Sequence, residues 1–85
     1  MGIENRTALH TAVYEGKIEI AKLLLINGAF IDARTIHYRT PLHISCILGE
    51  EQMCELLLKE RAEVNVQDYE MNTPTHYAAF YSILM

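Results

Sequence analysis

The sequence lacks the features that would place it in a membrane or on a nucleic acid. Its 85 residues contain no apolar run of about 18 or more, so no membrane-spanning helix is expected. It has 7 Lys and Arg against 11 Asp and Glu, a net charge of -4, and no basic cluster. Nucleic acids and anionic membrane surfaces select such clusters, so neither is expected as a partner. The N-terminus also lacks a secretory apolar stretch, and Arg6 stands where myristoylation needs Ser or Thr.

Motifs of catalysis and metal binding are missing as well. The sequence has no G-x-S-x-G, no Gly-rich phosphate loop, no H-E-x-x-H and no C-x-x-C. The carboxylates Glu50, Glu51 and Glu55 are expected to form a solvated helix face rather than an acid/base pair. We therefore predict no enzyme activity, no cofactor, no metal and no small-molecule substrate.

Cysteine is scarce, with Cys46 and Cys54 as the two copies, both in apolar helical stretches. Without a secretory signal, the pair is predicted to be small, buried hydrophobic residues in a reducing compartment rather than a disulfide framework. We therefore expect an intracellular protein, cytoplasmic or nuclear.

What the sequence does contain is one short segment that recurs at a fixed interval. Thr40-Pro41-Leu42-His43 has a counterpart thirty-three residues earlier, Thr7-Ala8-Leu9-His10, and another thirty-three residues later, Thr73-Pro74-Thr75-His76. Periods of about 20 to 50 residues indicate stacked repeats, each of which cannot bury its apolar face alone. An apolar fraction of 51% suits such a folded array.

The first unit is predicted to hold two short helices. Thr7 is a good N-cap for the first helix, and Gly16 ends it because a residue just past a helix often needs positive φ. A second helix is predicted over residues 17–26 and ends at Asn27-Gly28. Its expected inward-facing residues are Ile20, Leu23 and Leu24.

The second unit repeats this plan, and the third is partial. Thr40 caps a helix that Gly49 ends, a second helix covers residues 50–59, and another first helix follows Thr73. Projecting, extended loops are expected between the units. We divide the single array, residues 1–85, into repeat one (2–34), repeat two (35–67) and partial repeat three (68–85).

Several features of the sequence recur together: the period, the T-x-L-H and T-P-x-H segments, the Gly between helices, the Leu-Leu-Leu runs and Asn27-Gly28-Ala29-x-Ile31-Asp32. In these features the sequence resembles the ankyrin repeat. The resemblance implies a mostly α solenoid of stacked helix-turn-helix units linked by β-hairpin loops. It also implies a non-catalytic module that binds a partner protein through its hairpin tips and the concave face of its first helices. The alternative is a targeting or regulatory fragment of a larger enzyme, channel or ubiquitin-ligase adaptor.

Several residues depart from the family pattern. Glycine is usual at the hairpin tips, where this chain has Asn5, Tyr38 and Met71, and after the second helix, where it has Arg61. If these positions still require a left-handed backbone, Tyr38, Met71 and Arg61 each cost roughly 1 kcal/mol. Thr75 also takes the position of a core leucine.

The recurring His10, His43 and His76 are predicted to be structural. Stacked helices lie about 8–10 Å apart, whereas a shared zinc ion needs every nitrogen at about 2 Å, so the three cannot converge on a metal. The resemblance implies that they bond to backbone at the helix starts and hairpins. His37 lies outside the pattern and is expected to be an exposed loop residue.

The positions that the repeat leaves variable are the predicted partner-binding residues. Adjacent apolar pairs, Ile47-Leu48 and Phe80-Tyr81, cannot both be buried on one narrow stripe, so part of each pair is expected to be exposed; packing against a missing repeat is an equal alternative for Phe80 and Tyr81. We expect a monomer that binds an unidentified protein, unless the open C-terminal edge self-associates. The predicted contact residues are Arg6, Tyr14, Glu15, Ile36, His37, Arg39, Ile47, Leu48, Tyr69, Glu70, Phe80 and Tyr81.

Overall fold

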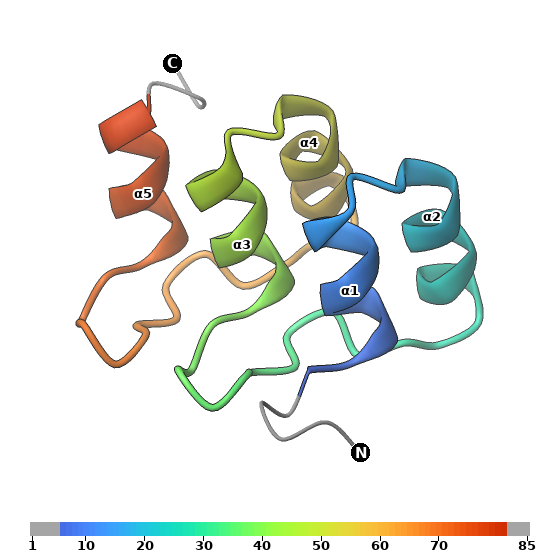
Figure 1. The fold of residues 1–85 in the computed structure, drawn as a ribbon, viewed down its shortest axis with the longest axis horizontal. Helices are drawn as coiled ribbons and strands as arrows, with labels where there is room; N and C mark the ends of the chain where they lie inside the picture. Colours follow the sequence, from blue (N-terminus) through green and yellow to red (C-terminus); the bar gives the residue numbers. More distant parts are fainter. Residues whose placement is uncertain (1–5, 82–85) are drawn as a thin grey trace.

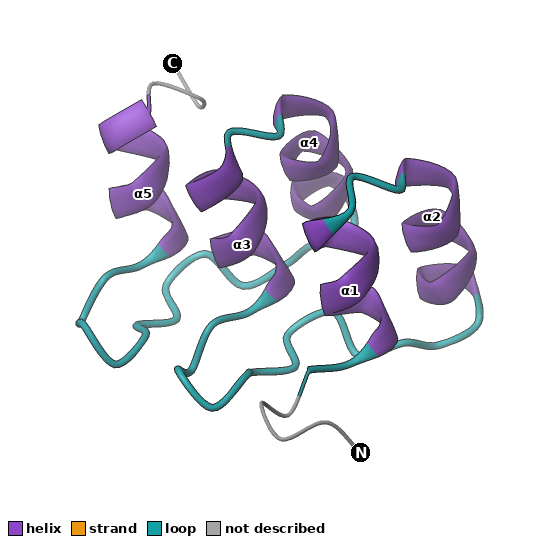
Figure 2. Ribbon diagram, in the orientation of Figure 1, coloured by secondary structure: helices purple, strands orange, loops and turns teal. Residues whose placement is uncertain are grey.

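The computed structural model describes residues 6–81, and within this range the chain forms five helices and no β-strand (Figure 2). Side chains are described up to Tyr77. None of the helices in this range is both long and apolar enough to cross a membrane. In chain order the helices are α1 (Ala8–Tyr14), α2 (Ile18–Ile26), α3 (Pro41–Leu48), α4 (Glu51–Lys59) and α5 (Pro74–Tyr81).

The helices lie in two rows. Figure 1 shows α5, α3 and α1 side by side in one row, with α4 and α2 in a second row alongside it. Packing follows the same order, since α3 contacts α1, α4 and α5, and α2 contacts α1 and α4. The long loops before α3 and α5 project from one side of the molecule. This arrangement confirms the predicted helical solenoid, in which the third unit contributes only a first helix among the described residues.

Each first helix starts at a cap built from threonine and histidine. The Thr40 hydroxyl oxygen accepts the backbone N–H of His43 at 3.3 Å, and the His43 Nδ1 accepts the backbone N–H of Thr40 at 3.1 Å. These two bonds satisfy donors that a helix start otherwise leaves unpaired. Thr7 with His10 and Thr73 with His76 form the same pair of bonds.

Two of these imidazoles, those of His10 and His43, also reach the next loop along the chain. Because Nδ1 of His43 accepts an N–H, its proton lies on Nε2, which donates to the carbonyl of Asn72 at 2.9 Å. The Nε2 of His10 makes the corresponding bond to the carbonyl of Arg39 at 3.1 Å. The structural role predicted for the recurring histidines is therefore confirmed. Burial lowers the pKa of both His10 and His43.

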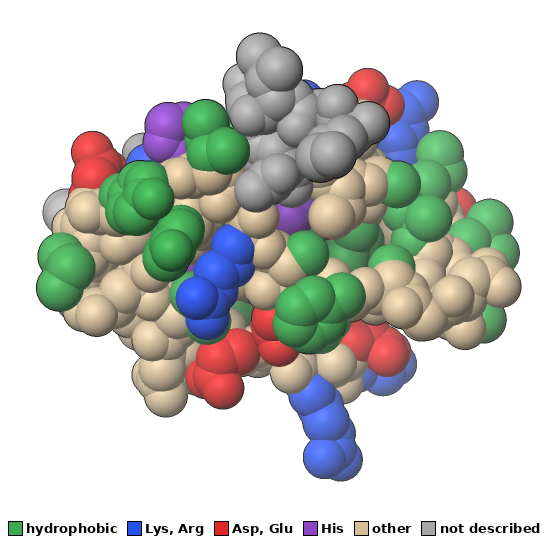
Figure 3. Space-filling model, turned by 90° about the horizontal axis from the view of Figure 1, so that it is seen from below, with side chains coloured by type: hydrophobic (Ala, Val, Ile, Leu, Met, Phe, Trp, Pro, Cys, Tyr) green, Lys and Arg blue, Asp and Glu red, His purple; other side chains and the backbone are tan. Residues whose placement is uncertain are grey.

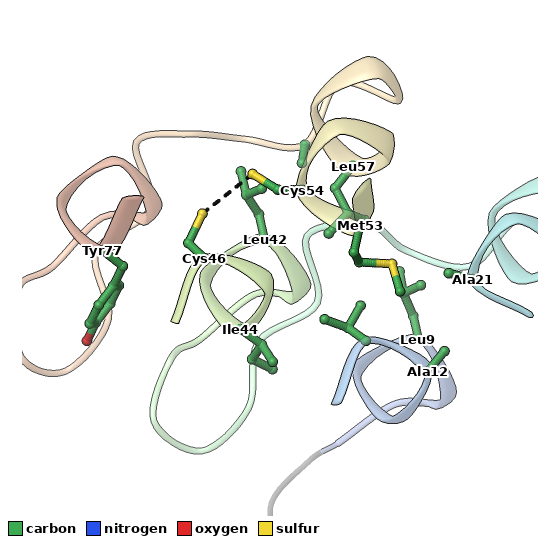
Figure 4. Packing of buried hydrophobic residues seen from close by; sticks show 12 residues of the cluster. Leu9, Ala12, Ala21, Leu42, Ile44, Cys46, Met53, Cys54, Leu57 and Tyr77 are labelled. Atoms are coloured by element: carbon green, nitrogen blue, oxygen red, sulfur yellow. Dashed lines mark hydrogen bonds between the residues drawn. The ribbon is translucent and has the colours of Figure 1, made fainter. Parts of the chain in front are cut away.

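The core lies between the two rows of helices. Leu9 and Val13 of α1, Leu42 of α3, and Met53 and Leu57 of α4 are fully buried and belong to one cluster (Figure 4). Burying a side chain of this size stabilises a fold by about 1.5–3 kcal/mol. The first helices α1 and α3 therefore turn apolar side chains toward the core.

The predicted inward face of α2 is wrong for two of its three residues. Ile20 and Leu23 are 49% and 59% exposed, whereas Ala21 is fully buried and Leu24 is partly buried. The helix turns its small residue toward the core, so the two large side chains lie on an open face.

The second unit explains this exposure. Met53 and Leu56 stand thirty-three residues after Ile20 and Leu23, and both are shielded. Met53 lies beside Leu9 and Ala21 in Figure 4, so it packs against the first unit. No helix of the described residues lies on the corresponding side of α2, and its matching face is left open.

Positive φ angles occur where the pattern predicts them. Gly16 and Gly49 have φ of 68° and 72°, and Tyr38, Arg61 and Met71 have 61°, 69° and 66°. Arg61 follows α4 in a hydrogen-bonded helix end in which its own N–H bonds to the Leu58 carbonyl at 3.0 Å. The three non-glycine positions in this range therefore keep the left-handed backbone that is usual for glycine there. Asn5 lies outside the described residues.

Replacing Arg61 with glycine is expected to stabilise the fold. The Arg61→Gly variant relieves the clash of a Cβ at positive φ and should raise the free energy of unfolding by up to about 1 kcal/mol. Urea unfolding followed by circular dichroism measures this change. Arg61→Ala is the matched control, because it retains the Cβ and should bring no gain; an equal gain in both variants would contradict the argument.

Acidification is expected to weaken the fold through the buried imidazoles. As pH falls through about 6.5, the unfolded chain takes up protons that folded His10 and His43 resist, so the unfolded state binds more protons. The contribution of the two imidazoles to the free energy of unfolding should therefore be fully present above this pH, and the free energy of unfolding should decrease from pH 7 to pH 5. Urea unfolding at the two pH values measures the change.

Two other shifted groups can be separated from this effect. Asp68 has a lowered pKa, so its contribution is lost only at pH values below about 4. Burial raises the pKa of Glu50, which gives a contribution of the opposite sign. Imidazole resonances followed by NMR assign the effect: titration of both His10 and His43 at or above pH 6.5 would contradict it.

Candidate functional site

Two projecting tips have the same backbone geometry. In the first, the Thr35 N–H donates to the Arg39 carbonyl at 3.0 Å, and the Tyr38 N–H donates to the Thr35 carbonyl at 2.9 Å. In the second, Asp68, Met71 and Asn72 make the same two bonds, both at 2.9 Å. These turns have the tip hydrogen bonds of hairpins, although the described residues contain no β-strand.

A buried polar side chain fixes each tip from inside. The Thr35 hydroxyl accepts the His37 N–H at 3.2 Å, and an Asp68 carboxylate oxygen accepts the N–H groups of Glu70 and Asn72 at 2.9 and 3.0 Å. Both Thr35 and Asp68 are buried. Side chains of this kind stabilise turns because they pair with nearby backbone donors.

The two tips carry exposed apolar side chains, and an aromatic ring of one tip meets an aromatic ring of the other. Figure 3 views the loop side of the molecule, where one group of hydrophobic side chains lies on the left, toward the end that carries α5. Tyr38 and Tyr69 stack with ring centroids 4.6 Å apart and planes at 20°. The N–H of Tyr69 also donates to the His37 carbonyl at 3.0 Å, which links the two loops. We define the tip surface as Ile36 (40% exposed), Tyr38 (44%), Tyr69 (65%) and Met71 (63%).

Arg39 clamps the two tips together beneath this surface. Its Nε donates to Asp68 Oδ2 at 3.2 Å, and its Nη2 donates to Glu70 Oε1 at 3.2 Å and to the Tyr77 hydroxyl at 3.3 Å. The Tyr77 hydroxyl in turn donates to Asp68 Oδ2 at 2.6 Å. One guanidinium therefore joins the loop before α3, which carries it, to the loop before α5 and to α5 itself.

The charge on Asp68 is maintained despite its burial. Burial alone would raise the pKa of this carboxyl, but hydrogen bonds from the Tyr77 hydroxyl, the Asn72 N–H and the Arg39 guanidinium outweigh that effect and lower it. Charge-assisted bonds of this kind are stronger than neutral ones. The clamp therefore contains a carboxylate at neutral pH, and the guanidinium is its counter-ion.

The structure brings some predicted site residues together and leaves others apart. Tyr14 and Leu48, two of the predicted contact residues, are exposed at the C-terminal ends of α1 and α3. The Arg6 guanidinium lies over the Tyr14 ring, 4.3 Å from its centroid. Ile47 is partly buried against the core. The exposed residues of the predicted set also include Glu15, Ile36, His37, Tyr69 and Glu70.

Two of the predicted contacts, Arg39 and Glu70, form an ion pair with each other. Arg39 and Glu70 take part in the clamp, in which the Arg39 side chain is 28% and the Glu70 side chain 69% exposed. The side chains of Phe80 and Tyr81 lie outside those that the structure describes. The partner-binding role of the whole predicted set stays a prediction.

Sequence reasoning had placed Tyr38 and Met71 among the strained tip positions and not in the contact set. Both belong to the tip surface, and both hold a conformation that glycine adopts at lower cost. The sequence signal that could have identified them as surface residues is a large apolar residue at a tip position where glycine is usual. The Arg39 clamp had no such signal, because Arg39 and Asp68 stand 29 residues apart.

Metal chemistry finds no support in this part of the chain. Across the described residues, no three His, Cys, Asp or Glu side chains gather closely enough to hold a metal ion.

Comparison with protein families decides the assignment. A family model described as Ankyrin repeat matches residues 4–36, and one described as Ankyrin repeats (3 copies) matches residues 32–84. The chain belongs to the ankyrin repeat family. Ankyrin repeats are generally protein–protein interaction modules and are typically not catalytic. The comparison with curated proteins found no match.

Removing the Arg39 clamp is expected to destabilise this ankyrin array. The Arg39→Ala variant leaves the buried Asp68 carboxylate without its counter-ion, which should lower the free energy of unfolding by about 1–2 kcal/mol. Urea unfolding measures the loss. Arg34→Ala is the matched control: the exposed Arg34 lies over the Tyr38 ring at 5.8 Å, a contact worth about 0.5–1 kcal/mol. An equal loss in both variants would contradict the clamp.

Proposed function

We propose that this ankyrin chain binds a partner protein through the tip surface. The observation that carries the proposal is the Tyr38–Tyr69 stack, whose rings lie 4.6 Å apart while 44% and 65% of the two residues remain exposed. Aromatic side chains held in place before binding lose little conformational entropy when a partner covers them. They are also enriched among the residues that dominate binding energy at protein interfaces.

Backbone strain supports the same assignment. Tyr38 and Met71 adopt positive φ at the tips, which costs roughly 1 kcal/mol for a residue with a Cβ. Their side chains do not repay this cost by burial, because both are exposed. Strain of this kind concentrates where it serves function. Contact with a partner would bury these side chains and compensate for the strain.

The interface is proposed to extend from the tips onto the first helices. Tyr14 and Leu48 supply further apolar contacts at the ends of α1 and α3. Polar residues around them would set the register and the association rate more than the affinity. The remaining proposed contacts are Arg6, Glu15, His37, Arg39, Ile47, Glu70, Phe80 and Tyr81.

An intracellular location, cytoplasmic or nuclear, belongs to the same proposal. Cys46 and Cys54 are both free, buried thiols. Free thiols persist in the reducing compartments of the cell, whereas extracellular domains of this size are commonly stapled by disulfides.

Glycine substitutions at the two strained tips test the proposal. Tyr38→Gly and Met71→Gly remove exposed apolar side chains and at the same time relieve the positive φ, so the fold should not be weakened by more than about 1 kcal/mol. A partner is captured from a cell lysate with the unmodified chain and then purified. Calorimetric titration should show affinity about tenfold lower or more for each variant.

The matched control is a similar change on a different face. Ile26 is 79% exposed and belongs to α2. This helix lies in the second row, apart from the loops before α3 and α5, so Ile26→Ser should leave the affinity unchanged. A partner that binds the tip variants as tightly as the unmodified chain would exclude the tip surface as the binding site.

A further inference from the structure

Cys46 and Cys54 face each other across the interface between α3 and α4. Their sulfur atoms are 3.7 Å apart, and both residues are fully buried (Figure 4). At this separation either thiol can donate a weak hydrogen bond to the other. The predicted burial of the two cysteines is confirmed, but their close approach was not visible in the sequence.

The first unit shows that sulfur is not needed at these positions. Thirty-three residues before Cys46 and Cys54 stand Val13 and Ala21, which are likewise fully buried at the α1–α2 interface. An ankyrin unit of this chain therefore packs its two helices with aliphatic side chains alone. The second unit has a dithiol in the same place, which adds chemistry that the first unit lacks.

We propose that Cys46 and Cys54 form a redox modification site, at which a small-molecule disulfide such as oxidised glutathione converts the dithiol into an intramolecular disulfide. The bond would join α3 to α4 within the second unit. It requires the sulfur atoms to approach by about 1.7 Å, from 3.7 Å to the disulfide bond length of about 2.05 Å. This inference does not depend on the proposed binding function.

The reaction proceeds by two thiol–disulfide exchanges. Cys54 lies on α4, the helix whose opening exposes it, so Cys54 is the first nucleophile. Its thiolate attacks one glutathione sulfur, forms a mixed disulfide and releases one glutathione thiolate. The Cys46 thiolate then attacks the Cys54 sulfur, closes the protein disulfide and releases the second glutathione. Two electrons and two protons pass from the protein to one molecule of oxidised glutathione.

Access to the buried pair comes from local opening of α4. Among the described helices, α4 packs against α3 and α2, and Figure 1 shows no helix on its other side in the second row. Elements with few packing neighbours open at lower free energy than the whole domain unfolds. Opening at α4 exposes Cys54, and closing returns it to Cys46.

Intact mass spectrometry tests the site on the folded chain. The reduced protein is incubated with oxidised glutathione at neutral pH, the reaction is quenched with acid, and the intact mass of the protein is measured. The expected product is a monomer lighter by two hydrogen atoms, and peptide mapping should join Cys46 to Cys54. Addition of reduced dithiol should restore the original mass.

Single-cysteine variants supply the matched controls. Cys46→Val and Cys54→Ala introduce the residues that occupy the same places in the first unit, so both variants should fold. Each should accumulate at most the mixed disulfide with glutathione, and neither should give the product lighter by two hydrogen atoms, because ring closure is removed.

Three results would overturn the proposal. A stable mixed disulfide on the unmodified chain would show that Cys46 does not complete the exchange. A product that forms only in urea would show that the folded geometry does not direct it. A covalent dimer on a non-reducing gel would show that the thiols pair between chains rather than within one.

Discussion

A single carbonyl oxygen at each tip accepts two hydrogen bonds, and the remaining structure depends on this arrangement. The Asn72 carbonyl accepts the Asp68 N–H, which closes the tip, and the Nε2–H of His43, which attaches that tip to α3. The Arg39 carbonyl accepts the Thr35 N–H and the Nε2–H of His10 in the same way. Each imidazole thus fixes a helix start and the following loop together. The neutral imidazole is required, because its two nitrogens accept and donate in turn.

A tip held in this way can support a strained backbone. Tyr38 and Met71 occupy positive φ, which for residues with a Cβ costs roughly 1 kcal/mol each. The buried Thr35 and Asp68 side chains and the Arg39 guanidinium supply bonds that keep the turns closed. Because the turns cannot relax, the aromatic and apolar side chains at their ends stay outward. The regular segment around Thr40 is therefore a scaffold, and the variable loop residues beside it form the candidate surface.

Repetition makes most of this architecture predictable from the sequence. A fixed interval of thirty-three residues places Thr, His and Gly at equivalent points, and each residue type has one local conformation that it favours there. Caps, helix ends and positive φ angles follow from those local preferences. The buried face of α2 does not follow from them, because helical periodicity predicts an apolar stripe but not which neighbouring helix covers it. Ile20 and Leu23 matched an inward stripe and are exposed, since no described helix packs on that side.

The sequence by itself determined the period, the helix boundaries and the strained positions, since these depend on interactions within a few residues. It also narrowed the candidate site to the loops and first helices. Only the tertiary structure decided which side chains meet: the Tyr38–Tyr69 stack, the Arg39 clamp on Asp68 and the facing thiols of Cys46 and Cys54. The physical reason is that stacking brings together residues of separate units or helices, and the spacing within one unit carries no record of those contacts.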